Sequence, residues 1–157
     1  MKYFNFKKIG LGLVAILVIL QFVRPTKNEG MALNENDILH FDSVPADVQK
    51  ILETSCYDCH SNHTTYPWYT SIQPIGLWMQ WHVNDGKKEL NFSEFKTNTP
   101  KRQKHKFEEI SEVIEADEMP LWSYTLIHTE TKLSAEQKTI LTNWAKQSFD
   151  KMVVPAP

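Results

Sequence analysis

The chain has 157 residues, which is long enough for one folded domain of ordinary size. Its 17 basic and 19 acidic residues give a formal net charge of -2, and four of the basic residues lie among the first 24 positions. The rest of the chain therefore carries 13 basic against 19 acidic residues. This balance argues against nucleic-acid binding, because a phosphate-binding surface needs an excess of positive charge.

The N-terminal residues 1–24 have the pattern of an export signal that stays in the membrane. Three lysines precede an apolar run from Ile9 to Val23, and Arg24 closes it. No small-x-small cleavage site and no cysteine for lipid attachment follow this run, so we expect an uncleaved anchor. The run is short beside the roughly 20 residues of a spanning helix, and Phe4 extends it. We expect a transmembrane helix that holds the rest of the chain on the periplasmic side of a bacterial inner membrane.

The next segment, residues 25–41, is polar and lacks apolar periodicity, which is typical of a tether. We expect the folded domain over residues 42–150 and a short C-terminal tail over 151–157. No internal repeat indicates a second domain.

The first helix of the domain is predicted to begin near Ser43 or Val44 and to run into Cys56. Pro45 falls at an early position of this helix, where its missing N–H costs little. Apolar residues then recur at helical spacing, which predicts a core-facing stripe of Val44, Val48, Ile51 and Leu52.

The segment Cys56-Tyr57-Asp58-Cys59-His60 matches the pattern by which haem is attached covalently in c-type cytochromes. In that chemistry the two thiols add to the two vinyl groups of the haem, and the adjacent imidazole binds the iron from one face. The pattern predicts one covalently held haem per chain, with Cys56 and Cys59 as attachment sites and His60 as an iron ligand. Such attachment takes place outside the cytoplasm, in agreement with the export signal.

Two other kinds of site stay open for the same residues. A redox-active dithiol of thioredoxin type uses a CxxC pair, but it follows a strand in an α/β pattern, and no such strand precedes Cys56. A structural zinc site is the other, because five residues are competent ligands: Cys56, Cys59, His60, His63 and His82. Zinc ribbons usually present a second cysteine pair, and this chain has only two cysteines.

Aromatic residues crowd the stretch after the motif. We expect Trp68, Tyr69 and Trp78 to wall a haem pocket, because flat apolar side chains suit the faces of a porphyrin. Their N–H and O–H groups also suit hydrogen bonds to the haem propionates. The alternative is that these residues form ordinary core.

Helices account for the remainder of the domain. We expect a helix over about 74–83, a turn at 84–86, an N-cap at Asn91 or Ser93, and a helix over 101–116. The last helix is predicted to follow an N-cap at Ser134, with Gln137 three residues on as in a capping box. No alternating strand pattern of useful length appears, so the predicted fold class is all-α.

A haem iron has a second axial position, and Met119 is our candidate for it. This methionine stands before Pro120 at a break just after a helix, from which a loop side chain can reach the opposite face of the haem. Ligation by histidine and methionine raises the reduction potential. The alternative role for Met119 is to fill a gap in the core. The rival ligands are His63, His82 and His128.

The ligand His60 needs a partner of its own. A hydrogen bond from its Nδ1–H fixes the plane of the ring and the basicity of the ligand. We expect the acceptor to be a backbone carbonyl near Pro67 or Pro74.

The stretch CYDCHSNHTTYPWY, from Cys56 to Tyr69, resembles the opening signature of small cytochrome c-like haem-binding domains of bacterial envelope proteins. Further matches are Pro74, Trp78, His82, Leu90 to Ser93, Met119-Pro120, Tyr124, His128 and Leu133 to Trp144. The resemblance covers about Asp42 to Trp144. It implies a cytochrome c-like helical fold, covalent haem at Cys56 and Cys59, His60 as the proximal ligand and Met119 on the distal side. The aromatic insertion after His60 departs from the mitochondrial type.

Our leading hypothesis is a membrane-anchored monohaem cytochrome that passes single electrons between redox proteins of the cell envelope, a carrier rather than an enzyme. The basic stretch 101–106 is either the solvated start of a helix or a docking surface for an acidic redox partner. A second hypothesis is a haem-based module that binds or senses small ligands, with weak peroxidase activity, in which Met119 is displaceable. A structural zinc module is the third.

Overall fold

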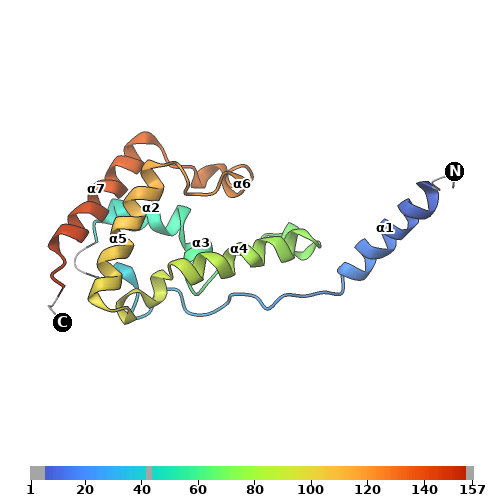
Figure 1. Ribbon diagram of the computed structural model, residues 1–157, viewed down its shortest axis with the longest axis horizontal. Coiled ribbons are helices and arrows are strands. Elements are labelled where there is room, and N and C mark those ends of the chain that lie inside the picture. The colour runs from blue at the N-terminus through green and yellow to red at the C-terminus, as the bar shows by residue number, and fades with distance from the viewer. Residues whose placement is uncertain (1–5, 42–43, 155–157) are drawn as a thin grey trace.

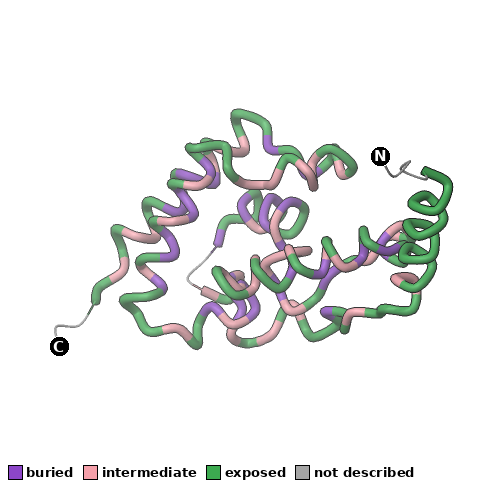
Figure 2. Tube along the Cα trace, turned by 45° about the vertical axis from the view of Figure 1, so that its right-hand side comes forward, coloured by how far each residue is buried: buried purple, intermediate pink, exposed green. Residues whose placement is uncertain are grey.

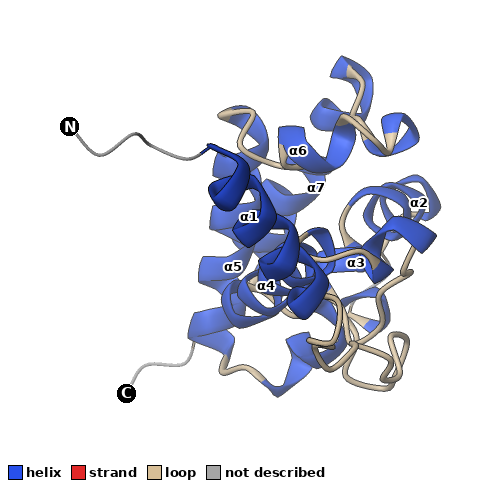
Figure 3. Cartoon of the chain, turned by 90° about the vertical axis from the view of Figure 1, so that its right-hand side faces the viewer, coloured by secondary structure: helices blue, strands red, loops and turns tan. Residues whose placement is uncertain are grey.

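The computed structural model describes residues 6–41 and 44–154 (Figure 1). Within these ranges the chain forms helices joined by loops and no strand, apart from an isolated antiparallel bridge between Glu29 and His63 (Figure 3). The all-α prediction is confirmed. Phe4 and Ser43, which entered the predictions, lie outside the described residues.

The α-helices are α1 (Phe6–Leu20), α2 (Ala46–Ser55), α3 (Tyr57–His60), α4 (Ile75–Glu89), α5 (Pro100–Glu115), α6 (Trp122–Thr125) and α7 (Ala135–Lys151). Short 3₁₀ helices lie between them: η1 (Ile38–His40), η2 (Trp68–Ser71), η3 (Phe92–Thr97) and η4 (Thr129–Thr131).

Helix α1 projects from one end of the molecule and buries none of its residues (Figure 1). Its 15 residues rise by only about 22 Å, whereas the hydrocarbon core of a bilayer is roughly 30 Å thick. Among the described residues, no helix combines the length and the apolar character needed to cross a membrane. The transmembrane helix that we expected is thus not found there, because the helix ends at Leu20, short of Arg24.

Much of the hydrophobic core comes from α2, α5 and α7, and α7 packs against both of the other helices. Buried and exposed residues alternate along the helices (Figure 2). The stripe predicted for the first helix is buried throughout: Val44, Val48, Ile51 and Leu52. Phe107 of α5 meets Trp144 of α7 edge to face, with ring centroids 5.4 Å apart. Helix α7 begins with the predicted capping box of Ser134 and Gln137. Periodicity and capping therefore predicted this part of the fold correctly.

Helix α4 is longer than we expected and contains the predicted turn. It continues through residues 84–86 to Glu89, so the turn prediction is wrong. The sequence Asn-Asp-Gly favours a turn locally, but α4 packs closely against α3 and the tertiary contact outweighs that preference. Gly86 permits the close approach, since a Cβ there would lie 2.8 Å from the Cys59 carbonyl oxygen.

The last residues of the expected tether pack into the domain. Ile38 is fully buried in the core, and Asp37 beside it is fully buried as well. The Asp37 side chain accepts hydrogen bonds from the Leu39 N–H at 2.8 Å and from the Tyr57 hydroxyl at 2.5 Å. The segment before the first core helix is thus bonded directly to the middle of the CxxCH motif.

Candidate functional site

The CxxCH motif forms a single turn of helix. Cys56 ends α2, and its carbonyl oxygen accepts hydrogen bonds from the N–H groups of Cys59 at 3.2 Å and His60 at 3.0 Å. Three reactive side chains are therefore displayed by one rigid turn between the longer helices α2 and α4. No disulfide joins the two cysteines.

The aspartate in the middle of the motif holds this turn from outside. One oxygen of Asp58 accepts a hydrogen bond from the Thr65 N–H at 3.0 Å, and the other accepts one from the Tyr124 hydroxyl at 2.6 Å. The Asp58 carbonyl oxygen also accepts a bond from the Thr64 hydroxyl at 2.6 Å. The loop after the motif and helix α6 are thus both fastened to the residue between the two cysteines.

The imidazole of His60 is oriented by the end of α4. Its Nδ1 lies 2.9 Å from the Leu90 carbonyl oxygen, and since a carbonyl only accepts, Nδ1 carries the proton. The acceptor is therefore the Leu90 carbonyl, and our prediction of a carbonyl near Pro67 or Pro74 is wrong. Burial lowers the pKa of His60, which keeps the ring neutral. The lone pair on Nε2 is thus free to bind a metal ion.

The two thiols are held in the protonated form. Burial raises the pKa of Cys56 to about 12 and that of Cys59 to about 11. Dithiols of oxidoreductases have the opposite property, because their nucleophilic cysteine has a lowered pKa. This environment argues against the thioredoxin-type alternative.

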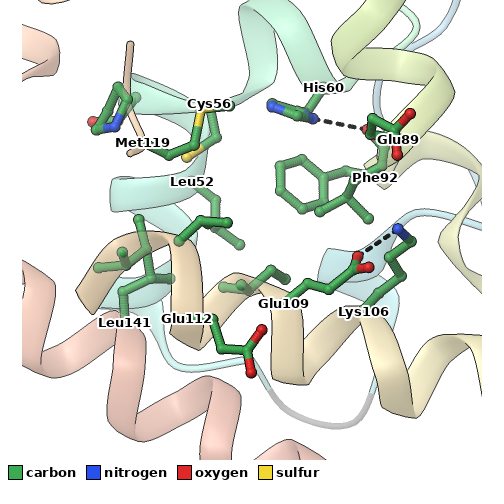
Figure 4. A pocket seen from close by; sticks show the side chains of 16 residues that line it. Leu52, Cys56, His60, Glu89, Phe92, Lys106, Glu109, Glu112, Met119 and Leu141 are labelled. Carbon is green, nitrogen blue, oxygen red and sulfur yellow. Dashed lines mark hydrogen bonds and ion pairs between the residues drawn. The ribbon is translucent and has the colours of Figure 1, made fainter. Parts of the chain in front are cut away.

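Beside the motif lies an apolar cavity of about 330 Å³, which Figure 4 shows from close by. Cys56 and His60 line it on one side and helix α5 on the other. Its apolar walls are Leu52, Leu90, Phe92, Ile110, Val113, Ile114, Met119 and Leu141. A volume of this size and an apolar lining are typical of pockets that hold an organic ligand.

A second cavity of about 240 Å³ adjoins the first and shares Cys56, His60 and Met119 with it. Cys59 and His82 also line this second space. Both cysteines, the predicted proximal ligand and the predicted distal ligand thus line this second cavity, and we call the two adjoining cavities together the hollow. Among the rival ligands only His82 is on its wall.

The remaining candidate residues lie elsewhere. Trp68, Tyr69 and Trp78 line neither cavity, and Trp68 is 78 % exposed. The Tyr69 hydroxyl is hydrogen-bonded to His128 Nε2 at 2.5 Å, which occupies both side chains. His63 is exposed and takes part in the isolated bridge.

Sequence reasoning missed several residues that border the hollow. Phe92 stacks on Tyr57 with ring centroids 5.3 Å apart and also flanks His60. Lys106 is only 7 % exposed and forms an ion pair with Glu109 inside the cavity wall. Helical spacing puts Lys106 one turn before Ile110, on the buried face of α5. This spacing could have predicted its burial, but a lysine is usually expected to face solvent.

The chemistry of this hollow fits a haem. It offers two thiols, a neutral imidazole, a thioether and an apolar wall within one space, which matches what an iron porphyrin needs from a protein. Among the described residues no three His, Cys, Asp or Glu side chains come together as a metal-ion site.

Comparisons with known proteins agree with this chemistry. A family model described as a haem-binding domain matches residues 15–147, while no curated protein and no solved structure matches the chain. The match covers 133 of the 157 residues. The chain therefore belongs to the family of haem-binding domains.

Proposed function

We propose that this protein is a monohaem c-type cytochrome that carries single electrons, with the haem attached covalently through Cys56 and Cys59. One observation supports this proposal most directly. A single helical turn presents two protonated thiols and a neutral imidazole to an apolar hollow that Met119 also lines. A haem bound without covalent attachment has no use for two thiols at this spacing.

Cys56 and Cys59 would each hold the haem by a thioether bond. Each bond would correspond to net addition of one S–H across one vinyl group, so attachment would consume no oxidant. Burial raises the pKa of both thiols, so both are protonated at neutral pH. The hydrogen bonds from the N–H groups of Cys59 and His60 to the Cys56 carbonyl keep the turn in shape.

His60 and Met119 are the residues that would bind the haem iron. The Leu90 carbonyl holds the imidazole so that Nε2 is available, and burial keeps it unprotonated. Bound haem supplies one-electron exchange between ferric and ferrous iron. Lys106 is a buried cation in the cavity wall and is paired with Glu109. We propose that its ammonium group would also pair with a haem propionate, which would weaken its ion pair with Glu109.

We place the protein in the bacterial envelope, on the periplasmic side of the inner membrane. The basic and apolar N-terminal segment supports export, and c-type attachment takes place outside the cytoplasm. Its partners are then other redox proteins of the envelope. The exposed charges of the basic stretch, Lys101 and Arg102, suit an acidic partner surface.

The test is production in a host that matures c-type cytochromes, followed by mass spectrometry and reduced-minus-oxidised spectra. We expect a mass one haem above that of the polypeptide and a c-type band that survives extraction with acidified acetone. The variant Cys56→Ser/Cys59→Ser should bind haem that is extractable. Extractable haem in the unaltered protein would refute covalent attachment.

A haem module that binds small ligands is the second candidate. Met119 comes from the segment between α5 and α6 rather than from a helix, so it can move away from the iron more easily than His60. Rapid binding of carbon monoxide by the reduced protein would favour this module. An unchanged reduction potential in Met119→Ala would show that the distal assignment is wrong, and His82→Ala then tests the other ligand on the wall.

A further inference from the structure

One end of the domain exposes large apolar side chains that the haem site does not use. Trp68 is 78 % exposed and Trp122 is 76 % exposed. Further exposed apolar residues follow each of them within ten positions of the chain: Ile72, Ile75, Trp78, Leu126 and Ile127. We call these seven residues the aromatic end. A grouped apolar surface of this kind marks an interaction site in a stable protein.

The segments that form the aromatic end are free of charge. Residues 59–84 contain no Lys, Arg, Asp or Glu, and neither do residues 119–129. At the 23 % charged residues of the whole chain, the longer segment of 26 residues would hold about six. These two segments therefore contribute no Lys, Arg, Asp or Glu side chain to the aromatic end.

The two segments lie side by side. The Tyr69 hydroxyl and His128 Nε2 are 2.5 Å apart, and His128 stacks on Tyr124 with ring centroids 4.6 Å apart. These contacts join η2, which begins with Trp68, to the chain that follows α6, which begins with Trp122. The aromatic end is thus one surface made by two uncharged segments.

Helix α1 is fastened to this same end. The Gln21 side chain donates to the Gln73 carbonyl and accepts from the Gln73 N–H, both at 3.0 Å. The Arg24 guanidinium donates to the Ser71 carbonyl at 2.8 Å. These bonds flank Ile72, so the C-terminal end of α1 meets the aromatic end, from which α1 projects away from the domain (Figures 1 and 3).

The apolar surface of helix α1 indicates what kind of partner binds the aromatic end. Apolar residues are exposed around its whole circumference, from Leu11 to Ile19, and none is buried. A helix that packs on a protein keeps a polar face toward water, whereas a helix that is apolar on all sides belongs in an apolar medium. Because the C-terminal end of α1 is bonded to residues 71 and 73, insertion of α1 into an apolar medium would bring the aromatic end to the surface of that medium.

We propose that the aromatic end is a membrane-docking surface, with α1 inserted in the lipid and Trp68 and Trp122 in the interfacial layer. Tryptophan suits this layer, because its ring is apolar and its N–H reaches a polar partner. The proposal concerns the surface of the folded domain and does not depend on how the haem is held. The haem spectrum of each variant below serves only to show that the site is intact.

The first test measures which residues lipid covers in the full-length chain. The full-length chain is bound to vesicles of phosphatidylethanolamine and phosphatidylglycerol and exposed to hydroxyl radicals. Mass spectrometry then measures the oxidation of each residue. The reference is the variant Leu13→Lys/Ile16→Lys without vesicles, in which two exposed positions of α1 are made polar. We expect oxidation of Trp68 and Trp122 to fall at least threefold relative to Met31, which is 70 % exposed on the tether. Equal ratios in the two samples would overturn the proposal.

The second test removes the aromatic side chains and measures binding to the same vesicles in the Leu13→Lys/Ile16→Lys background. We expect Trp68→Ser/Trp122→Ser to lower the partition coefficient at least tenfold. The matched control is Met31→Ser/Val153→Ser, which also removes two exposed apolar side chains and should change it less than twofold. Equal partitioning of the two pairs would refute the lipid assignment. A lipid-free dimer that only the tryptophan pair dissociates would assign the surface to a second copy instead.

Discussion

Replacement of Gly86 by alanine tests whether the close approach of α4 to the CxxCH turn holds the site together. The new Cβ would lie 2.8 Å from the Cys59 carbonyl oxygen and 3.3 Å from the Cys59 Cβ. Ordinary van der Waals contact begins at 3.4 Å, so helix and motif must separate by about 0.6 Å. The nearest atom belongs to the backbone and cannot rotate away. We therefore expect the strain to reach the CxxCH turn itself.

Two opposing effects set the magnitude. Gly86 lies inside α4, and alanine is favoured over glycine in a helix by about 1 kcal/mol. Overpacking costs about 1–3 kcal/mol, and a backbone contact belongs at the upper end of that range. We expect Gly86→Ala to lower the free energy of unfolding by about 1–2 kcal/mol.

The measurement is urea unfolding of the haem-loaded protein, followed by circular dichroism. Gly12→Ala is the matched control, because it is also a helical glycine but has no atom within 4 Å of its new Cβ. Gly76→Ala should be worse than Gly86→Ala, since its Cβ would lie 2.0 Å from the Thr70 carbonyl oxygen. Only Gly86→Ala should also shift the haem spectrum. If Gly86→Ala proved as stable as Gly12→Ala and kept an unaltered spectrum, the reasoning from close approach would be refuted.

Three further predictions concern polar contacts. Burial raises the pKa of Asp37 above its usual 3.8, so its contribution to stability is present at low pH and is lost as pH rises through the folded-state pKa. In Asp37→Asn this decline should disappear from urea unfolding measured between pH 4 and 8, and persistence of the full slope would contradict the assignment. Tyr124→Phe removes the hydrogen bond to Asp58 and should lower the free energy of unfolding by about 1–2 kcal/mol. A double-mutant cycle with Asp58→Ala should show that the two effects are coupled, and strict additivity would argue against the bond. Ser134→Ala removes the N-cap of α7 and should cost about 1 kcal/mol in thermal unfolding, unlike the exposed control Ser71→Ala.

Features that depend on nearby residues were predictable from the sequence. The capping box at Ser134 and the cap at Asn91 are formed as expected, since each involves residues within one helical turn. The buried stripe from Val44 to Leu52 follows from helical spacing in the same way. The place of Met119 on the wall of the hollow was also expected, because a loop after α5 can return over the motif.

Features that depend on distant pairs were not predictable. The acceptor for His60 is Leu90, thirty residues away, and no pattern near the motif indicates which carbonyl will arrive there. Gly86 looked like a turn residue until its contact with Cys59 gave it a role inside a helix. Trp68 was expected on a haem wall because aromatic side chains suit both porphyrins and interfaces, and composition alone does not distinguish these two surroundings.

Hydrogen bonds from three side chains of the CxxCH turn explain how the hollow is kept in shape. Tyr57 donates to Asp37 in the segment before α2, Asp58 accepts from α6, and His60 donates to the chain after α4. Three residues of one helical turn thus bind three distant parts of the chain. The imidazole of His60 is therefore oriented by the fold, through a hydrogen bond to the backbone of Leu90. Changes in any of these three segments should alter the haem environment even where they touch no atom of the haem, because each segment is hydrogen-bonded to the turn that carries His60.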